Sequence, residues 1–179
     1  MGNSPLPQEH RVHQHRVYLG LGANLGDPPR HLRDCLRALT TEVDHLEISP
    51  LYRTQPVSEI PQPWYLNLVA TGVTRLAPYD LLGFLQSLER AAGRDRRQPD
   101  APRTLDVDLL LYGRLESEDS SLTLPHPRMR HRRFVLAPLA DLAPDLKIPP
   151  DNKTVDQLLT DLPRGEQVQL VPWPIAERP

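Results

Sequence analysis

The order of strand-like and helix-like segments constrains the fold of this chain more than any other feature of its sequence. Alternating apolar residues favour strands, and leucines that recur every three or four residues favour helices. The sequence predicts these elements in order: a strand over 17–21, a helix over 28–40, strands over 43–53 and 64–75, a helix from 78 that stops at Gly93, and a strand over 104–112. Two consecutive strands between two helices form the split βαβ plan. We therefore predict an α+β fold, a ferredoxin-like sandwich whose mainly antiparallel sheet carries helices on one face.

Extra C-terminal elements are expected after this core. The pattern predicts a short strand over 122–126, a helix over 128–140 and a short capped helix over 154–159. Neither end of the chain offers a regular apolar pattern, and the residues after 163 are rich in proline. The predicted organisation is a disordered lead-in at 1–15, a single domain at 16–162 and a loose C-terminal tail at 163–179.

Composition narrows the class of protein. The formal net charge is −2 and aromatic residues make up 5% of the chain, which argues against a nucleic-acid-binding module. No apolar run approaches the roughly 20 residues that span a bilayer, and the first 16 residues lack the apolar core of a secretory signal. A single cysteine, Cys35, cannot form an internal disulfide, which fits a reducing compartment. We expect a cytoplasmic monomer with no nucleic-acid or membrane partner.

Asp106 and Asp108 are the clearest candidates for chemistry. The residues around and between them are apolar: Leu105, Val107, Leu109 and Leu111. Side chains alternate across a strand, so both carboxylates would project from one face and the apolar side chains from the other. Mg²⁺ is usually bound by one or two carboxylates together with substrate phosphates. The pattern therefore indicates a metal site, and the alternative is a solvated polar face on an edge strand.

Basic residues gather close to this carboxylate strand in the sequence. Five arginines lie between 90 and 103, and four more lie between 128 and 133. Guanidinium groups bind phosphate through paired N–H donors. His126 stands between Pro125 and Pro127, and a stiff backbone would aim its imidazole. Basic segments beside paired carboxylates predict a metal–nucleotide site, and the alternatives are solvated basic loops and a structural histidine.

The glycine-rich stretch at 20–26 does not carry a dinucleotide-binding fingerprint. Its spacing is Gly-x-Gly-x-x-x-Gly, one residue longer than the Rossmann pattern, and no regular βαβ alternation follows. The sequence also has no Walker A motif, which excludes a P-loop kinase. The glycines more simply allow the backbone to approach a neighbour or a ligand closely.

Six segments together resemble the 6-hydroxymethyl-7,8-dihydropterin pyrophosphokinases, a family of folate biosynthesis. They occur in the expected order: LGLGANLGD at 19–27, YRT at 52–54, YLN at 65–67, QSLERAAGR at 86–94, PRTLDVDL at 102–109 and LPHPRMRHRRF at 124–134. The resemblance implies the same ferredoxin-like fold. It also implies an enzyme that transfers the β,γ-diphosphate of ATP to the hydroxymethyl group of 6-hydroxymethyl-7,8-dihydropterin and releases AMP.

The resemblance further implies roles for individual residues. Asp106 and Asp108 would hold two Mg²⁺ ions that bridge the triphosphate of ATP. The other residues fall into three groups: phosphate contacts and catalysis at Arg94, Arg96, Arg103, His126 and Arg132; nucleotide contacts at Gln86, Glu89, Leu109 and Thr123; and pterin contacts at Thr54, Val57, Tyr65, Asn67 and Phe134. In the last group Tyr65 and Phe134 would sandwich the ring and Asn67 would read its hydrogen-bonding edge.

Two features separate this chain from the family pattern. The loop before Pro102 reads Pro99-Asp100-Ala101 where the family usually has Arg-Trp-Gly, and Pro127 stands where Tyr is frequent. The metal and pterin residues are present, so we expect activity. The alternatives are an ordinary kinase on the same fold, which would release ADP, and a nucleic-acid-binding module, which the charge and the aromatic content disfavour.

Overall fold

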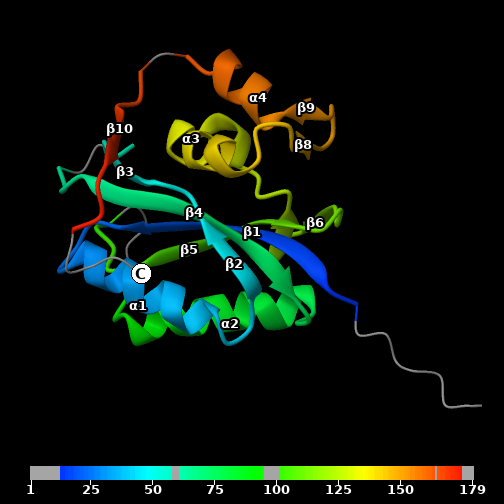
Figure 1. The fold of residues 1–179 in the computed structure, drawn as a ribbon, viewed down its shortest axis with the longest axis horizontal. Coiled ribbons are helices and arrows are strands. Elements are labelled where there is room, and N and C mark those ends of the chain that lie inside the picture. The colour runs from blue at the N-terminus through cyan, green and yellow to red at the C-terminus, as the bar shows by residue number, and fades with distance from the viewer. Residues whose placement is uncertain (1–12, 58–60, 95–100, 164, 175–179) are drawn as a thin grey trace, which may run out of the picture.

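A computed structural model of the chain describes residues 13–57, 61–94, 101–163 and 165–174. Its elements in chain order are β1 (His15–Ala23), α1 (Pro28–Leu39), β2 (Asp44–Ile48), β3 (Leu51–Thr54), β4 (Tyr65–Thr74), α2 (Pro78–Ala91), β5 (Asp106–Tyr112), β6 (Ser117–Asp119), β7 (Leu122–Leu124), the 3₁₀ turn η1 (Met129–His131), α3 (Arg133–Leu142), β8 (Lys147–Ile148), β9 (Lys153–Thr154), α4 (Val155–Asp161) and β10 (Val168–Val171). Figure 1 shows three layers, with α1 and α2 on one face of the central sheet and α3 and α4 on the other. No helix in the described ranges is long and apolar enough to cross a membrane.

The central sheet has six strands, and β1 lies between the two strands that carry the candidate site. The strand order is β10-β3-β4-β1-β5, and β2 also pairs with β4. All strand pairs in the described part of the chain are antiparallel, so the predicted mainly antiparallel sheet is confirmed. Because β1 pairs with β4 on one side and β5 on the other, it brings residues far apart in the sequence into one row.

Apolar side chains cover both faces of this sheet. One core cluster packs against α1 and α2 and includes Leu19, Leu21, Leu32, Leu36, Leu81 and Leu85. The other packs against α3 and α4 and includes Val69, Leu110, Leu136, Leu139, Val155 and Leu158. The prediction that helices cover one face only is therefore wrong. The second face also carries apolar side chains such as Val69 and Leu110, and burying them under helices is favourable for the same reason as on the first face.

A β-bulge in β5 interrupts the alternation that the sequence predicts for this strand. The register of β1 against β5 shifts by one residue at Leu110. Leu110 and Leu111 both pack on the α3 side, whereas strict alternation would place Leu111 toward α1 and α2. Asp106 and Asp108 precede the bulge and keep the predicted alternation, so their side chains share the α3 side of the sheet with Leu110.

Several element boundaries differ from the predicted ones. The strand predicted over 43–53 is divided into β2 and β3 at Pro50, which has no N–H to contribute to a ladder. The helix predicted over 128–140 consists of η1 followed by α3. β1 begins at His15, inside the predicted lead-in, where its imidazole stacks on Tyr112 with ring centroids 4.7 Å apart. The rest of that lead-in, residues 1–12, lies outside the described residues.

The prediction of a loose tail at 163–179 is wrong for residues 168–171. They form β10, which pairs with β3 so that Val168 lies opposite Thr54 and Val171 opposite Leu51. The pairing satisfies backbone groups at the edge of β3. Composition near the chain end could not reveal it, because the partner strand lies far away in the sequence. Residues 164 and 175–179 lie outside the described ranges.

Candidate active site

Two polar side chains flank a glycine in one row across three neighbouring strands of the sheet. Gly22 of β1 pairs with Asn67 of β4 on one side and with Asp106 of β5 on the other. A methyl group at Gly22 would overlap the Oδ1 atom of Asn67, so glycine is what leaves room for that side chain. Asn67 Nδ2 donates a hydrogen bond of 2.6 Å to Thr54 Oγ1 of β3, and both residues are buried. The glycine therefore allows a close approach, as the sequence predicts.

A pocket beside this row, called the aromatic pocket below, collects all five residues predicted to contact a pterin. Its lining is Thr54, Gln55, Val57, Gln62, Tyr65, Asn67, Arg103 and Phe134. Tyr65 begins β4, and Phe134 lies in the first turn of α3. Val57, at 66% exposed, is the most solvent-accessible of the five. Aromatic rings with a few fixed polar groups suit a flat heterocycle.

A second pocket, called the carboxylate pocket below, lies where β5 meets α2 and the segment 120–127. The four residues predicted to contact a nucleotide, Gln86, Glu89, Leu109 and Thr123, all line it. The lining also includes Arg94, Asp108 and His126. Cationic and carboxylate groups thus converge in a hollow that is distinct from the aromatic pocket.

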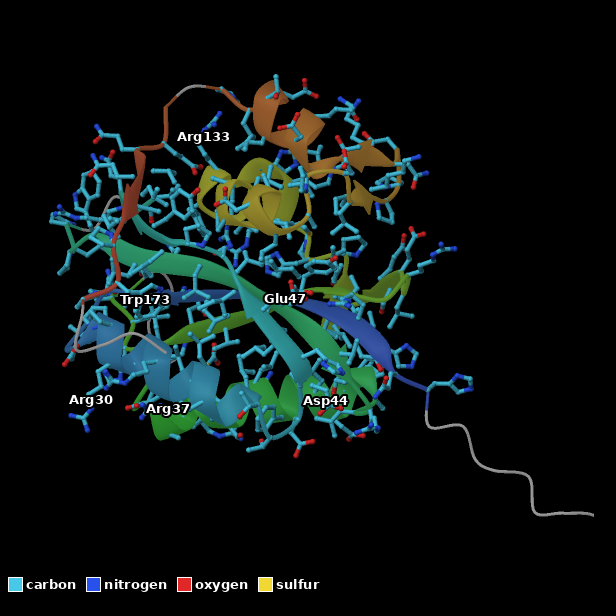
Figure 2. The ribbon with its side chains drawn as sticks, viewed as in Figure 1. Arg30, Arg37, Asp44, Glu47, Arg133 and Trp173 are labelled. Carbon is cyan, nitrogen blue, oxygen red and sulfur yellow. The ribbon has the colours of Figure 1, made fainter. Side chains whose placement is uncertain are left out.

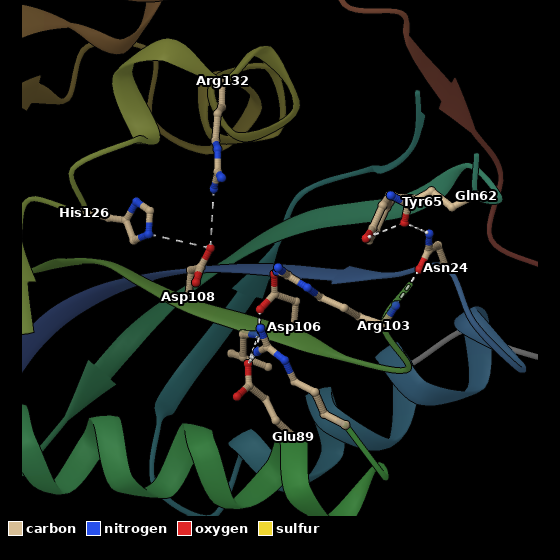
Figure 3. Close-up of polar contacts among 11 residues, drawn as sticks. Asn24, Gln62, Tyr65, Glu89, Arg103, Asp106, Asp108, His126 and Arg132 are labelled. Carbon is tan, nitrogen blue, oxygen red and sulfur yellow. Dashed lines mark hydrogen bonds and ion pairs between the residues drawn. The ribbon is translucent and has the colours of Figure 1, made fainter. Parts of the chain in front are cut away.

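Asp106 connects the two pockets through a pair of arginines (Figure 3). Its Oδ1 lies 2.6 Å from Arg94 Nη1, and its Oδ2 pairs with Arg103 Nη1. Arg103 lines the aromatic pocket, whereas Arg94 lines the carboxylate pocket. Arg94 also pairs with Glu89, a buried residue whose Oε1 accepts a hydrogen bond of 2.9 Å from Val107 N. The start of β5 is therefore fastened to the end of α2 at the point where the pockets meet.

Asp108 faces His126 and Arg132, which approach from the α3 side (Figure 3). Its Oδ2 lies 3.8 Å from His126 Nε2 and 3.9 Å from Arg132 Nη1. Burial and the neighbouring Asp106 charge raise the pKa of Asp108, although the three nearby basic groups act in the opposite direction. Burial likewise lowers the pKa of His126, which favours its neutral imidazole. The ionised form of Asp108 is thus disfavoured, and a nearby cation would stabilise it.

Four of the five predicted phosphate contacts are in the described residues, and these four lie together. Arg94 and Arg103 pair with Asp106, while His126 and Arg132 face Asp108. Arg96 lies outside the described residues. Most of the loop that departs from the family pattern lies outside them too.

The protein groups present fit Mg²⁺. Asp106 and Asp108 offer carboxylate oxygens from the same face of β5, and burial together with the Asp106 charge raises the pKa of Asp108, a cost that a divalent cation would offset. Within the described ranges, no group of three or more His, Cys, Asp and Glu side chains is gathered for a metal. The remaining ligands would come from phosphate and water, which is the usual arrangement for Mg²⁺.

Comparison with known proteins decides between a pyrophosphokinase, an ordinary kinase and a nucleic-acid-binding module. The sequence profile of the 7,8-dihydro-6-hydroxymethylpterin-pyrophosphokinase (HPPK) family matches residues 18–144. The chain belongs to this family. The resemblance carried by the six sequence segments is thereby confirmed.

Relatives of this HPPK-family chain match it over most of its length. The 2-amino-4-hydroxy-6-hydroxymethyldihydropteridine pyrophosphokinase of Pseudomonas aeruginosa is 43% identical over 150 residues, which are 83% of this chain and 92% of that protein. The protein of the same name in Bacillus subtilis is 37% identical over 143 residues, 79% of this chain and 86% of its own. The mitochondrial folate synthesis bifunctional protein of Arabidopsis thaliana is 40% identical, but the match covers 25% of that longer protein.

Solved structures share the fold of this HPPK-family chain. The crystal structure of wild-type Plasmodium falciparum HPPK-DHPS with pterin and p-hydroxybenzoate superposes with a TM-score of 0.62 over 87% of this chain, at 16% sequence identity. This chain spans 42% of the length of that protein. A second HPPK-DHPS structure, in complex with substrates, gives a TM-score of 0.65. The likeness shows that the mixed α+β architecture is that of HPPK structures.

Two polar residues beside the aromatic pocket, Asn24 and Gln62, have no role in the sequence-based prediction (Figure 3). Gln62 Oε1 accepts hydrogen bonds from Asn24 Nδ2 at 2.9 Å and from the Tyr65 hydroxyl at 3.1 Å. Asn24 Nδ2 also donates to Pro63 O at 2.9 Å, and its Oδ1 accepts from Arg103 N at 2.7 Å. Asn24 thereby joins the two loops beside the aromatic pocket. The one available signal was a polar side chain inside the glycine-rich stretch.

Proposed function

We propose that the protein transfers the β,γ-diphosphate of ATP to the hydroxymethyl group of 6-hydroxymethyl-7,8-dihydropterin and releases AMP. Membership of the HPPK family supports an enzyme of this type, a pyrophosphokinase of folate biosynthesis. The observation in this chain that carries the proposal is the Arg94–Asp106–Arg103 linkage. It joins a pocket suited to a flat heterocycle to one that gathers charged groups.

The proposed reaction asks the protein mainly for positioning and charge stabilisation. The pterin hydroxyl oxygen forms a bond to the β-phosphorus, and the bond from this phosphorus to the oxygen of the α-phosphate breaks. The hydroxyl proton passes to solvent, and AMP leaves with the bonding electrons. Guanidinium groups at Arg94, Arg103 and Arg132 would hold the negative charge that grows on the phosphate oxygens. The imidazole N–H of His126 would donate a hydrogen bond to a phosphate oxygen.

Asp106 and Asp108 would hold Mg²⁺, and we propose two ions. Bound there, the metal supplies positive charge to the triphosphate and helps to orient it. The raised pKa of Asp108 and the shared orientation of the two carboxylates support this assignment.

Each pocket would bind one substrate. In the aromatic pocket Tyr65 and Phe134 would sandwich the pterin, with Asn67 and Thr54 at its polar edge and Val57 at the mouth. In the carboxylate pocket, the nucleotide contacts would come from Gln86, Glu89, Leu109 and Thr123. The two substrates would then meet beside Asp106 and Asp108.

The remaining proposals concern the assembly and its setting. The order β5-β1-β4-β3, with α1 and α2 on one face, supports a ferredoxin-like core to which α3, α4 and β10 are added. A buried Cys35, whose pKa burial raises to about 12, supports a structural thiol in a reducing, cytoplasmic setting. We further propose that the protein works as a monomer, because both pockets are lined by one chain.

Product analysis tests the proposed reaction directly. The protein is incubated with ATP, Mg²⁺ and 6-hydroxymethyl-7,8-dihydropterin, and the nucleotides are separated and quantified. We expect AMP that depends on the pterin, in equal amount to the pterin diphosphate. Release of ADP instead would indicate an ordinary kinase. Absence of turnover in folded protein would contradict the proposal.

Gly22→Ala is expected to weaken pterin binding about tenfold or more. The added methyl group would displace the Asn67 side chain from Thr54, and overpacking of this kind costs roughly 1–3 kcal/mol. Gly20→Ala is the matched control on the same strand, because its methyl group would meet the Leu110 side chain at an ordinary 3.4 Å. Fluorescence titration with the pterin compares the two variants. Equal affinity in both would contradict the role given to the Gly22–Asn67 contact.

A further inference from the structure

α3 begins between two residues of the candidate site. Arg132 is the N-cap residue, Arg133 is the first residue of the helix and Phe134 is the second. The side chain of Arg132 makes no capping hydrogen bond, and it points instead toward Asp108 (Figure 3). Arg132 also lies over the Phe134 ring, with 5.2 Å between its guanidinium carbon and the ring centroid. The first N–H groups of α3 therefore need a partner from elsewhere in the chain.

Glu166 supplies one such partner from a segment distant in the sequence. Its Oε2 accepts a hydrogen bond of 2.9 Å from the backbone N–H of Arg133. A carboxylate at this position satisfies an N–H that has no partner within the helix and interacts favourably with the positive end of the helix dipole. The start of α3 is thus held by a residue two positions before β10.

The side chain of Arg133 ties the start of α3 to a second element, the C-terminal end of α4. Its Nη2 donates to the carbonyl oxygens of Leu159 at 3.3 Å and Leu162 at 3.0 Å, at the C-terminal end of α4. A cation there also complements the negative end of that helix. Figure 2 shows Arg133 beside α3 and α4, on the side of the molecule away from α1 and α2. Arg133 therefore faces the C-terminal elements, while its two neighbours face the site.

The segment that carries Glu166 is itself fastened to the aromatic pocket. Gln55 N donates a hydrogen bond of 3.0 Å to Gln167 O, and Val168 pairs with Thr54. Gln55 and Thr54 line that pocket, as does Phe134. The segment 165–168 thus connects two sides of the pocket, one on β3 and one at the start of α3.

We infer that Glu166 is a positioning residue for the reaction, acting through Arg133 on Arg132 and Phe134. These two side chains are each one residue from the capped N–H, so a shift of Arg133 moves both. The proposal rests on the proposed function, because it assigns Arg132 to phosphate and Phe134 to the pterin. Glu166 itself touches neither substrate.

Steady-state kinetics of Glu166→Ala, Glu166→Gln and Glu166→Asp test the inference. Loss of one helix cap corresponds to about a fivefold change in an equilibrium constant, so kcat/KM for the pterin should fall about fivefold or more in Glu166→Ala. KM for ATP should rise less than KM for the pterin: Arg132 is a proposed phosphate contact beside Arg133, but the nucleotide contacts at Gln86, Glu89, Leu109 and Thr123 lie outside α3. Glu166→Gln keeps an acceptor oxygen and should recover most of the loss, whereas Glu166→Asp reaches less far and should fall between the two.

Asp161→Ala is the matched control. Asp161 lies in the last turn of α4, and its exposed carboxylate pairs with Lys153 at 2.8 Å. The substitution removes a carboxylate near the C-terminal end of α4, where Arg133 binds, but it removes no contact of α3. We therefore expect wild-type kinetics. Pterin kinetics in Glu166→Ala equal to those of Asp161→Ala would overturn the inference. If Glu166→Ala does not fold, wild-type kinetics in Glu166→Asp would do the same.

Amide hydrogen exchange separates this inference from the proposed function. We expect faster exchange at the start of α3 in Glu166→Ala than in the wild type, because the Arg133 N–H loses its acceptor. Wild-type protein without pterin-dependent turnover would contradict the proposed function, and the exchange comparison would still test whether Glu166 holds α3. Unchanged exchange in a folded Glu166→Ala protein would overturn the positioning role.

Discussion

Asp108→Asn is expected to lower kcat by about 10³-fold while leaving the fold as stable as before or more stable. The amide keeps the shape of the side chain but cannot serve as an anionic ligand for Mg²⁺. Burial and the Asp106 charge raise the pKa of Asp108 in the folded protein. A carboxyl group with a raised folded-state pKa disfavours folding when it is ionised, so a neutral replacement removes that cost at pH 7.

The stability effect has a defined pH dependence. The cost of ionised Asp108 is present above its folded-state pKa, and it disappears as the pH falls below the ordinary value of 3.8. Thermal unfolding without divalent cations should therefore show an advantage of Asp108→Asn at pH 7 that shrinks on acidification. Turnover within tenfold of wild type would contradict the metal assignment. A clearly lower thermal stability of Asp108→Asn at pH 7 would contradict the view that ionised Asp108 destabilises the fold.

Asp106→Asn is the informative comparison. Asp106 pairs with Arg94 and Arg103, so its replacement leaves two guanidinium groups without their shared counter-charge. We expect turnover to be lost as in Asp108→Asn, but with a lower thermal stability. Unfolding measurements would thus distinguish the two carboxylates by their effects on stability, although both are needed for activity.

Arg132→Ala is expected to lower kcat by about 10²- to 10³-fold, the usual effect of removing one group that stabilises transition-state charge. Its guanidinium lies 3.9 Å from Asp108 and over the Phe134 ring, between the proposed phosphate and pterin positions. KM for the pterin should also rise, because Phe134 loses the group that packs on its ring. Rapid-quench measurement of AMP separates the chemical step from product release.

Arg130→Ala is the matched control, two residues away. Arg130 Nη2 binds both oxygens of Asp151 at 2.7 Å, and its Nη1 donates to the carbonyl oxygens of Ile148 and Pro149. Removing it should lower Tm by several degrees, roughly, with kcat near the wild-type value. If both variants lost kcat equally, the assignment of Arg132 to the reaction would be contradicted.

The sequence alone sufficed for the core elements and for much of the candidate site. The helices at 28–40 and from 78, and the strands that flank them, follow from periodicities that each segment carries itself. The shared face of Asp106 and Asp108 follows from the alternation of a strand, which no distant contact is needed to establish. Family motifs added the pterin and nucleotide residues, and these line two adjoining pockets.

The arginines near 130 show where local patterns stop being sufficient. Three arginines lie within four positions of one another, and no local pattern distinguishes them. Arg130 binds Asp151, Arg132 faces Asp108 and Arg133 binds the end of α4. A 3₁₀ turn followed by a helix start sets these directions, and both depend on packing against the second face of the sheet.

What the sequence determined by itself was the core helices and strands over 15–112 and the chemistry of the paired carboxylates, because both depend on residues that are neighbours in the chain. Tertiary structure alone decided that helices cover both faces, that 168–171 complete the sheet, that Asn24 and Gln62 join two loops beside the aromatic pocket, and that Glu166 binds the start of α3. Each of these depends on contacts between residues far apart in the sequence. A backbone or amide group finds such a partner only after the sheet has brought the segments together.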